Sequence, residues 1–362
     1  MSDSSEIQAS WQPADELREA ASRLRKQVAR VQLIEDEAKR HQEDDHRQGY
    51  FIGISGCILA DQGTEEATSS LSLDGEPLFD ITPIANLPDI GSLARALVPS
   101  SKRIFTQLDH LSRTIRHELY ISKRIAETPQ SALNLAYRVI SLLRLKSTCL
   151  INAVSFSNTP WGQVAAHTDD VFIQPLEDPR KSLWGSDSAI TSMDLEWVFE
   201  RIVRDFDLYE QPSYRLAYDS AADAPFLKDA RTAVARIWSG IESLFDVQNE
   251  LSFRLSMYAA VLISDNTDER VKTQARFKRL YALRSKAVHG AKMEDAKLAE
   301  TLEDSWHLLR DLLIACIRSG SSLPPTTALD QALLGRQLIR EEGGRFSDAD
   351  HPQEATIKNG PR

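Results

Sequence analysis

The sequence predicts a mainly α-helical protein in which a C-terminal helical bundle follows an N-terminal α+β region, itself preceded by a long amphipathic helix. Three observations indicate this fold class. The first 48 residues place apolar side chains at helical spacing among dense charges, residues 49–220 mix short apolar runs with helical stretches, and the pattern is helical from about residue 226. A chain of 362 residues also exceeds one ordinary core. We therefore expect segments at 1–48, 49–220, 226–320 and 321–362.

The segment 1–48 is predicted to form one long helix that ends near Gly49. Its apolar residues recur every three or four positions and make a narrow seam, as in a coiled coil. They are Leu17, Ala21, Leu24, Val28, Val31 and Ala38. Packing on the protein's own domain and self-association are both compatible with this seam.

The segment 49–220 is predicted to be an α+β unit. The apolar run at 50–60 favours a strand, and 71–79 favours a hairpin around Asp74 and Gly75. The other elements expected here are helices at 90–98, 101–127 and 130–147, returns to the sheet at 149–156 and 170–176, and a helix near 190–207. No motif indicates what this unit does, so recognition of an unknown ligand or regulator is an open alternative.

Helical periodicity continues through the last third of the chain. Helices are expected near 228–247, 250–264, 268–289 and 294–318, and a short one at 326–341 follows a linker rich in Ser and Pro. The polar tail after Gly343 is predicted to be disordered.

Composition limits the function classes. With 42% hydrophobic and 27% charged residues, no 18-residue apolar run and no secretion signal, we expect a soluble, cytoplasmic protein without membrane contact. Cys57, Cys149 and Cys316 lack the spacing of a zinc or redox pair and are expected to be buried. The His- and Asp-containing stretches at 41–46 and 167–170 fit solvated surface better than a metal site, so no metal or other cofactor is predicted.

Arg284 is an unusual cation in its predicted helix. On a wheel of about 100° per residue with Phe277 at zero, it falls at about 340°, inside the apolar face. An unpaired charge there is costly, so Arg284 needs a partner, and Glu242 in the preceding apolar helix is the candidate. The two residues would form a buried salt bridge between helices, or the guanidinium would be held ready for a phosphate.

His289 follows Arg284 by five residues, or about 140° around an ideal helix, so the two side chains do not converge by helical geometry alone. Gly290 predicts that the helix ends here with glycine at the C′ position. Such an end would free His289 from the helical direction. Alternatively, the two groups act across the seam of a dimer.

Charge is concentrated around this pair. Residues 270–292 hold eight basic residues and no acidic one, in a chain of net charge −10. This run is either a solvated helix face or a local site for phosphates. Four of its cations fall on one stripe away from the apolar face and are the candidate phosphate-binding residues: Lys272, Arg276, Arg279 and Lys286.

Three stretches resemble a known family: WSGIESLF at 238–245, RLSMYAAVLIS at 254–264 and, above all, LYALRSKAVHG at 280–290. They are similar to the Apea-like branch of the HEPN superfamily, in which one helix carries a Tyr, then Arg-Ser, then a hydrophobic residue followed by His-Gly. The resemblance covers roughly residues 226–320. Its Arg-x4-His motif is supported by the flanking Tyr281, Ser285, Val288 and Gly290.

The resemblance implies a bundle of four or five helices that commonly dimerises, and an activity found in many members: metal-independent RNA cleavage in antiviral defence or as a toxin. It implies that Arg284 and His289 are the catalytic pair, with Ser285 at the family's usual polar position; Glu242 is added from helix positions alone. His would move a proton and Arg would stabilise phosphate charge while the RNA 2′-OH attacks, giving a 2′,3′-cyclic phosphate. Because inactive members exist, a non-catalytic module that binds RNA or a protein partner is the alternative.

Overall fold

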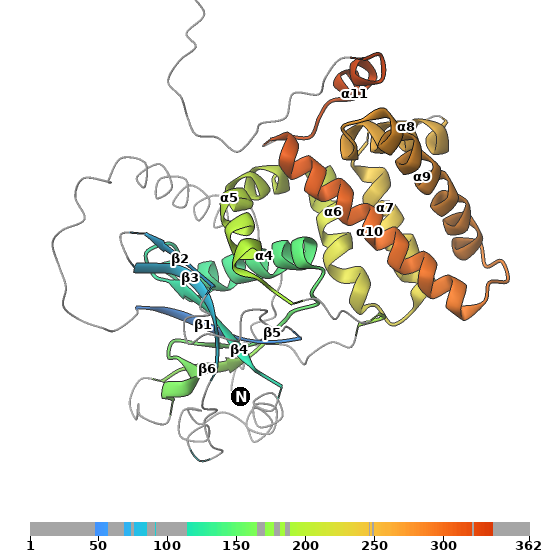
Figure 1. The fold of residues 1–362 in the computed structure, drawn as a ribbon. Helices are drawn as coiled ribbons and strands as arrows, with labels where there is room; N and C mark the ends of the chain where they lie inside the picture. The colour runs from blue at the N-terminus through green and yellow to red at the C-terminus, as the bar shows by residue number, and fades with distance from the viewer. Residues whose placement is uncertain are drawn as a thin grey trace, which may run out of the picture.

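The computed structural model describes residues 48–56, 69–73, 76–84, 91, 114–164, 171–176, 182–184, 189–245, 247, 250–320 and 322–335. Helices make up most of these residues, with one antiparallel sheet beside them (Figure 1). The expected N-terminal helix in 1–48 and the expected tail after Gly343 lie outside the described residues.

The sheet has six strands in the order β2-β3-β4-β1-β5-β6, and every neighbouring pair is antiparallel. The strand predicted at 50–60 and the hairpin predicted at 71–79 are both present, and the hairpin pairs Leu73 with Glu76. The predicted returns to the sheet are also confirmed. The strands are β1 (Gly49–Ser55), β2 (Ser69–Leu73), β3 (Glu76–Pro83), β4 (His117–Ser122), β5 (Asn152–Ser157) and β6 (Ile173–Pro175).

Strand β4 contradicts the helix predicted at 101–127, at least over its own six residues. It lies between β3 and β1 in the sheet, and five of its six residues are buried. Its three apolar residues, Leu119, Tyr120 and Ile121, are consecutive, and periodicity cannot separate so short an apolar run in a buried strand from one in a buried helix.

Two helices cover one face of the sheet. These are α4 (Pro129–Ser147) and α5 (Ser192–Tyr209), close to the predicted 130–147 and 190–207. Each begins with a capping box, Thr128 with Ser131 and Thr191 with Asp194, which satisfies the first backbone N–H groups. The opposite face of the sheet is covered by a smaller apolar cluster around Trp161, in the 3-10 turn η1 (Trp161–Gln163).

The remaining helices follow in sequence. Four of them match predicted helices closely: α7 (Ala230–Ser243), α8 (Leu251–Ile263), α9 (Thr267–Val288) and α10 (Asp295–Ser319). The short α11 (Thr326–Leu333) begins where the last helix was expected. Helix α6 (Pro212–Asp223), which leads into the 3-10 turn η2 (Ala224–Phe226), was not predicted. Its buried face includes Tyr214 and Tyr218, aromatic residues of low helix propensity, so tertiary packing and not local preference forms it.

One hydrophobic cluster extends from the sheet through α4, α5 and α6 into α7–α10, and includes Ile52 at one end and Trp306 at the other. The charged residues Arg138 of α4 and Asp205 of α5 lie inside it, 3.5 Å apart. Cys149 and Cys316 are buried as expected, whereas Cys57 lies outside the described residues. Within the described helices, none combines the length and apolar character needed to cross a membrane.

Candidate functional site

The candidate site lies at the C-terminal end of α9. Asn266 caps the start of this helix by accepting a hydrogen bond from the backbone of Glu269 at 2.9 Å. At the other end the helix stops at Val288, with His289 at the C-cap and Gly290 at a φ of 72°. The glycine was therefore correctly predicted as the C′ residue, because this left-handed conformation is strained for side chains with a Cβ.

Two backbone hydrogen bonds close the turn around His289. The N–H of Gly290 donates to the carbonyl of Ala287 at 3.4 Å, and the N–H of Ala291 donates to that of Lys286 at 3.0 Å. This pair of bonds is the Schellman motif, which satisfies carbonyl groups that would otherwise lack a partner at a helix end. His289 is thus presented by a defined turn, and its side chain is exposed.

Arg284 is half-buried and paired with Glu242, the partner expected from helix positions. Its Nη2 lies 3.2 Å from Glu242 Oε1, and the two side chains are 23% and 28% exposed. The guanidinium also lies over the ring of Tyr281, 5.6 Å from its centre. Arg284 is therefore held by one group from α7 and one from its own helix.

An aromatic cluster fixes α7 against α9 beneath this ion pair. Trp238 of α7 meets Phe277 and Tyr281 edge to face, with ring centres 5.2 Å and 5.3 Å apart. The indole N–H donates to the Ser305 hydroxyl of α10 at 3.1 Å, so its polar atom is satisfied inside the core. These contacts set the position of Glu242 relative to Arg284.

The other motif residues lie apart from this pair. Ser285 is half-buried, and Val288 is 39% exposed because the helix ends there, beyond the packed core. Among the described residues no contact joins Arg284 to His289, which lies about 7.5 Å further along the axis. The described contacts therefore do not join the two side chains within one chain.

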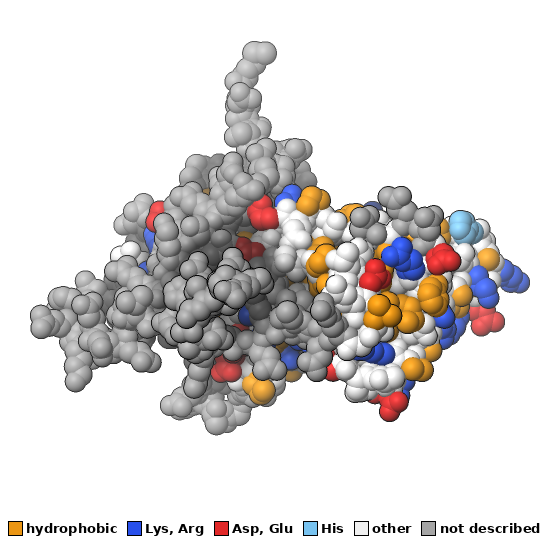
Figure 2. Space-filling view, turned by 90° about the horizontal axis from the view of Figure 1, so that it is seen from above, with side chains coloured by type: hydrophobic (Ala, Val, Ile, Leu, Met, Phe, Trp, Pro, Cys, Tyr) orange, Lys and Arg blue, Asp and Glu red, His pale blue; other side chains and the backbone are white. Residues whose placement is uncertain are grey.

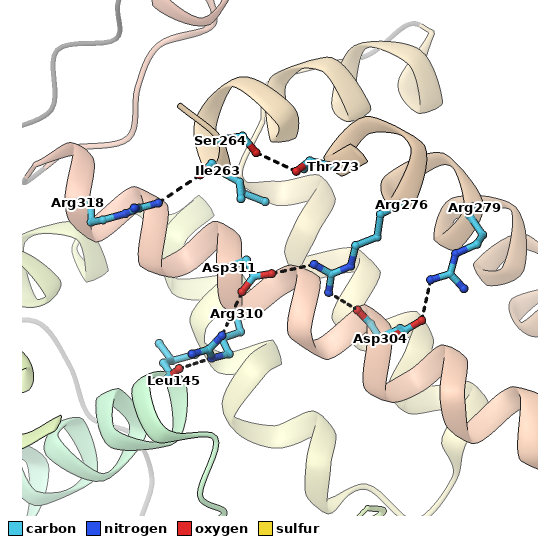
Figure 3. Close-up of polar contacts among 10 residues, drawn as sticks. All are labelled: Leu145, Ile263, Ser264, Thr273, Arg276, Arg279, Asp304, Arg310, Asp311 and Arg318. Atoms are coloured by element: carbon cyan, nitrogen blue, oxygen red, sulfur yellow. Dashed lines mark hydrogen bonds and ion pairs between the residues drawn. The ribbon is translucent and has the colours of Figure 1, made fainter. Parts of the chain in front are cut away.

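Two of the four cations in the predicted basic stripe pair with acidic residues of α10 (Figure 3). Arg276 donates to Asp311 Oδ2 at 2.9 Å and to the carbonyl of Asp304 at 3.3 Å, and Arg279 donates to Asp304 Oδ2 at 2.8 Å. Lys272 pairs with Glu269 on its own helix at 2.8 Å. Of the four predicted residues, Lys286 alone has no carboxylate partner among the described residues, and it is exposed.

The surface agrees with this contact pattern. In Figure 2, the helical part of the face shown carries Lys and Arg side chains interspersed with acidic and hydrophobic ones. The helical part of the molecule therefore shows no continuous basic surface in that view.

Arg231, in the first turn of α7, is a site residue that the sequence did not reveal. Its Nη1 donates to the carbonyl of Ala287 at 2.7 Å and its Nη2 to that of Ala291 at 3.0 Å. Asp229 caps α7 by accepting hydrogen bonds from the backbone and hydroxyl of Thr232, and these bonds hold the pKa of Asp229 below its usual value. The cap was a readable signal for where α7 starts, but no pattern connects Arg231 with a turn more than fifty residues later.

No group of three or more His, Cys, Asp or Glu residues that could hold a metal ion occurs among the described residues. The stretches 41–46 and 167–170 lie outside them. Comparison with protein-family models, with curated proteins and with solved structures found no match for this chain. The case for function therefore rests on the residues and contacts described above.

Proposed function

We propose that the chain is a metal-independent endoribonuclease of HEPN type, with α7–α10 as the HEPN-like bundle and with a role in antiviral defence or as a toxin. One observation carries the proposal most strongly. Helix α9 ends in a turn that exposes His289, five residues after an arginine that Glu242 holds half-buried at the end of the same helix. Defined surroundings of this kind for both motif residues support a catalytic role.

The chemistry follows from the residue types. His289 accepts the proton of the RNA 2′-OH, and the 2′-oxygen attacks the adjacent phosphorus. The P–O5′ bond breaks, the leaving 5′-oxygen takes up a proton, and the products are a 2′,3′-cyclic phosphate and a 5′-OH end. Arg284 donates hydrogen bonds to the non-bridging phosphate oxygens, where negative charge increases in the transition state.

A homodimer completes the site in this proposal. Because one chain separates Arg284 from His289, a two-fold axis near the end of α9 would place Arg284 of one protomer beside the partner subunit's His289. The resemblance to HEPN proteins supports a dimer through the bundle. Wild-type protein that is monomeric and still cleaves RNA at full rate would rule out the composite site.

RNA contact is assigned chiefly to Lys286, with Lys272 as a second cation. Lys286 lies between the two motif residues in sequence and is exposed, whereas the surface pair of Lys272 with Glu269 is of the weak kind that a phosphate can replace. Arg276 and Arg279 are tied to α10, so their first role is structural. Replacing Lys286 is therefore expected to reduce the salt dependence of binding more than replacing Arg276.

The test compares wild-type protein with Arg284→Ala and His289→Ala on labelled RNA in EDTA. Wild type should yield fragments that end in a 2′,3′-cyclic phosphate, and each variant should lose about 100-fold or more of this cleavage. Arg201→Ala, which removes a cation from α5 that pairs with its neighbour Glu200, serves as the control and should cleave normally.

Absence of cleavage by wild type would favour the alternative, a non-catalytic HEPN module. A gel shift that survives His289→Ala but is lost when Lys272 and Lys286 are replaced would support RNA binding without catalysis. Equal cleavage by wild type and His289→Ala would contradict the proposed mechanism.

A further inference from the structure

We infer that Arg231 is a positioning residue that holds the turn carrying His289. This inference rests on the proposed function, because it assigns Arg231 a part in the reaction through His289. No stretch that supports the family resemblance includes Arg231, since it precedes the first of them. The structure places its guanidinium directly on the backbone of the motif.

The two hydrogen bonds bracket His289. One carbonyl, of Ala287, lies two residues before it and the other, of Ala291, two residues after it, at 2.7 Å and 3.0 Å from the guanidinium nitrogens. A planar guanidinium presents its donors in a fixed fork, so the two contacts fix the separation and orientation of the carbonyls. Bonds with an ionised donor are also stronger than neutral ones. The turn therefore has an external clamp in addition to its own backbone bonds.

Helix dipoles favour the contact of Arg231 with the end of α9. A positive side chain in the first turn of α7 opposes that helix's own dipole, whose positive end lies there. Arg231 instead contacts the C-terminal end of α9, the negative end of a longer helix. The favourable interaction is thus with α9, as expected for a residue that acts on the neighbouring helix.

Helix α7 supplies both groups that fix the motif. Arg231 in its first turn holds the turn around His289, and Glu242 in its last turn holds Arg284. Between them, Trp238 packs against Phe277 and Tyr281 and sets how α7 lies on α9. Helix α7 therefore contacts both the side chain of Arg284 and the backbone of the turn around His289.

The test uses full-length Arg231→Gln and Arg231→Lys. The matched control is Arg236→Gln, which removes the charge of another α7 arginine whose partner is Asp223, at 3.9 Å. Amide hydrogen exchange of the 286–292 peptide reports on the turn, and kcat and KM for RNA cleavage report on the reaction. In Arg231→Gln we expect the amide exchange rate of this peptide to rise about ten-fold. We also expect kcat to fall about ten-fold, with KM unchanged. Arg231→Lys should recover part of the slow exchange and part of kcat. Arg236→Gln should match wild type in both measurements.

The outcomes separate this inference from the proposed function. Unchanged exchange in Arg231→Gln, or faster exchange with unchanged kcat, would overturn the positioning role. A higher KM at unchanged kcat would also overturn it, since Arg231 would then act as a direct ligand of RNA. If wild type cleaves no RNA, the catalytic part of the inference falls with the proposed function, while faster exchange would still establish that Arg231 holds the turn.

Discussion

At the scale of single residues, the Arg284–Glu242 pair is incompletely hydrogen-bonded. The contact between Nη2 and Oε1 is an ion pair at 3.2 Å, and Arg284 Nε is buried without a hydrogen-bond partner among the described residues. An unsatisfied donor of this kind costs free energy in the unbound protein.

Glu242→Gln tests how far the carboxylate orients Arg284. The amide keeps the size of the side chain but loses its charge, so we expect slower RNA cleavage, less impaired than in Arg284→Ala. Stability should fall by only about 0.5–1 kcal/mol, because the pair is partly solvated. Cleavage rates and urea unfolding measure the two effects.

Glu303→Gln on α10 is the control for that change, since Glu303 makes only a distant contact of 3.9 Å with His307. It should leave cleavage and stability near wild type. Faster cleavage in Glu242→Gln would show the opposite relationship, in which the carboxylate restrains Arg284 from its substrate.

At the scale of elements, α9 and α10 are joined by charges of opposite sign. Arg276 and Arg279 reach Asp311 and Asp304 across the helix interface, and Arg310 continues from Asp311 to the end of α4 (Figure 3). The cations that suggested a nucleic-acid surface thus also hold the bundle together. This explains how an acidic protein can concentrate eight basic residues in one stretch without exposing them all.

A double-mutant cycle of Arg276→Met and Asp311→Asn measures that link. We expect a coupling free energy of about 0.5–1 kcal/mol, since both side chains are only partly exposed. The matched cycle on Lys272 and Glu269, an exposed pair within α9, should give about 0.3 kcal/mol or less. Equal coupling in the two cycles, from urea unfolding curves, would refute an interhelical role for Arg276.

The sequence predicts elements better than the contacts between them. Periodicity found α9, and Gly290 marked its end, because both signals are local. Strand β4 was missed because its burial comes from neighbouring strands, and Arg231 because its partners lie on another helix. The Arg284–Glu242 pair could be anticipated only because a cation on an apolar face demands a partner. Contacts that depend on how two helices pack against each other can be identified only from the structure.

At the scale of the whole molecule, buried polar contacts join the sheet side to the helices. Arg138 of α4 lies over the rings of Tyr209 and Tyr218, 3.6 Å and 4.5 Å from their centres, and Tyr214 donates to Asp205 at 2.8 Å. Burial favours the neutral form of Arg138, but Asp205 and the surrounding tyrosines outweigh it and keep its pKa above the usual value. Arg310 adds a second link, from α10 to the carbonyl of Lys146 at the end of α4.

These links and the continuous core predict that sheet and bundle unfold together. Calorimetry should show one transition whose calorimetric and van't Hoff enthalpies agree. Arg138→Ala should lower stability by about 3–5 kcal/mol, because it leaves Asp205 buried without its partner, and it should shift that transition without splitting it. Adding Asp205→Asn should recover part of the loss, since the uncompensated charge is then gone. Two separate transitions in wild type would instead mean that the α+β unit and the bundle are independent domains. Ligand binding to the α+β unit would then have no cooperative route to the candidate site in the bundle.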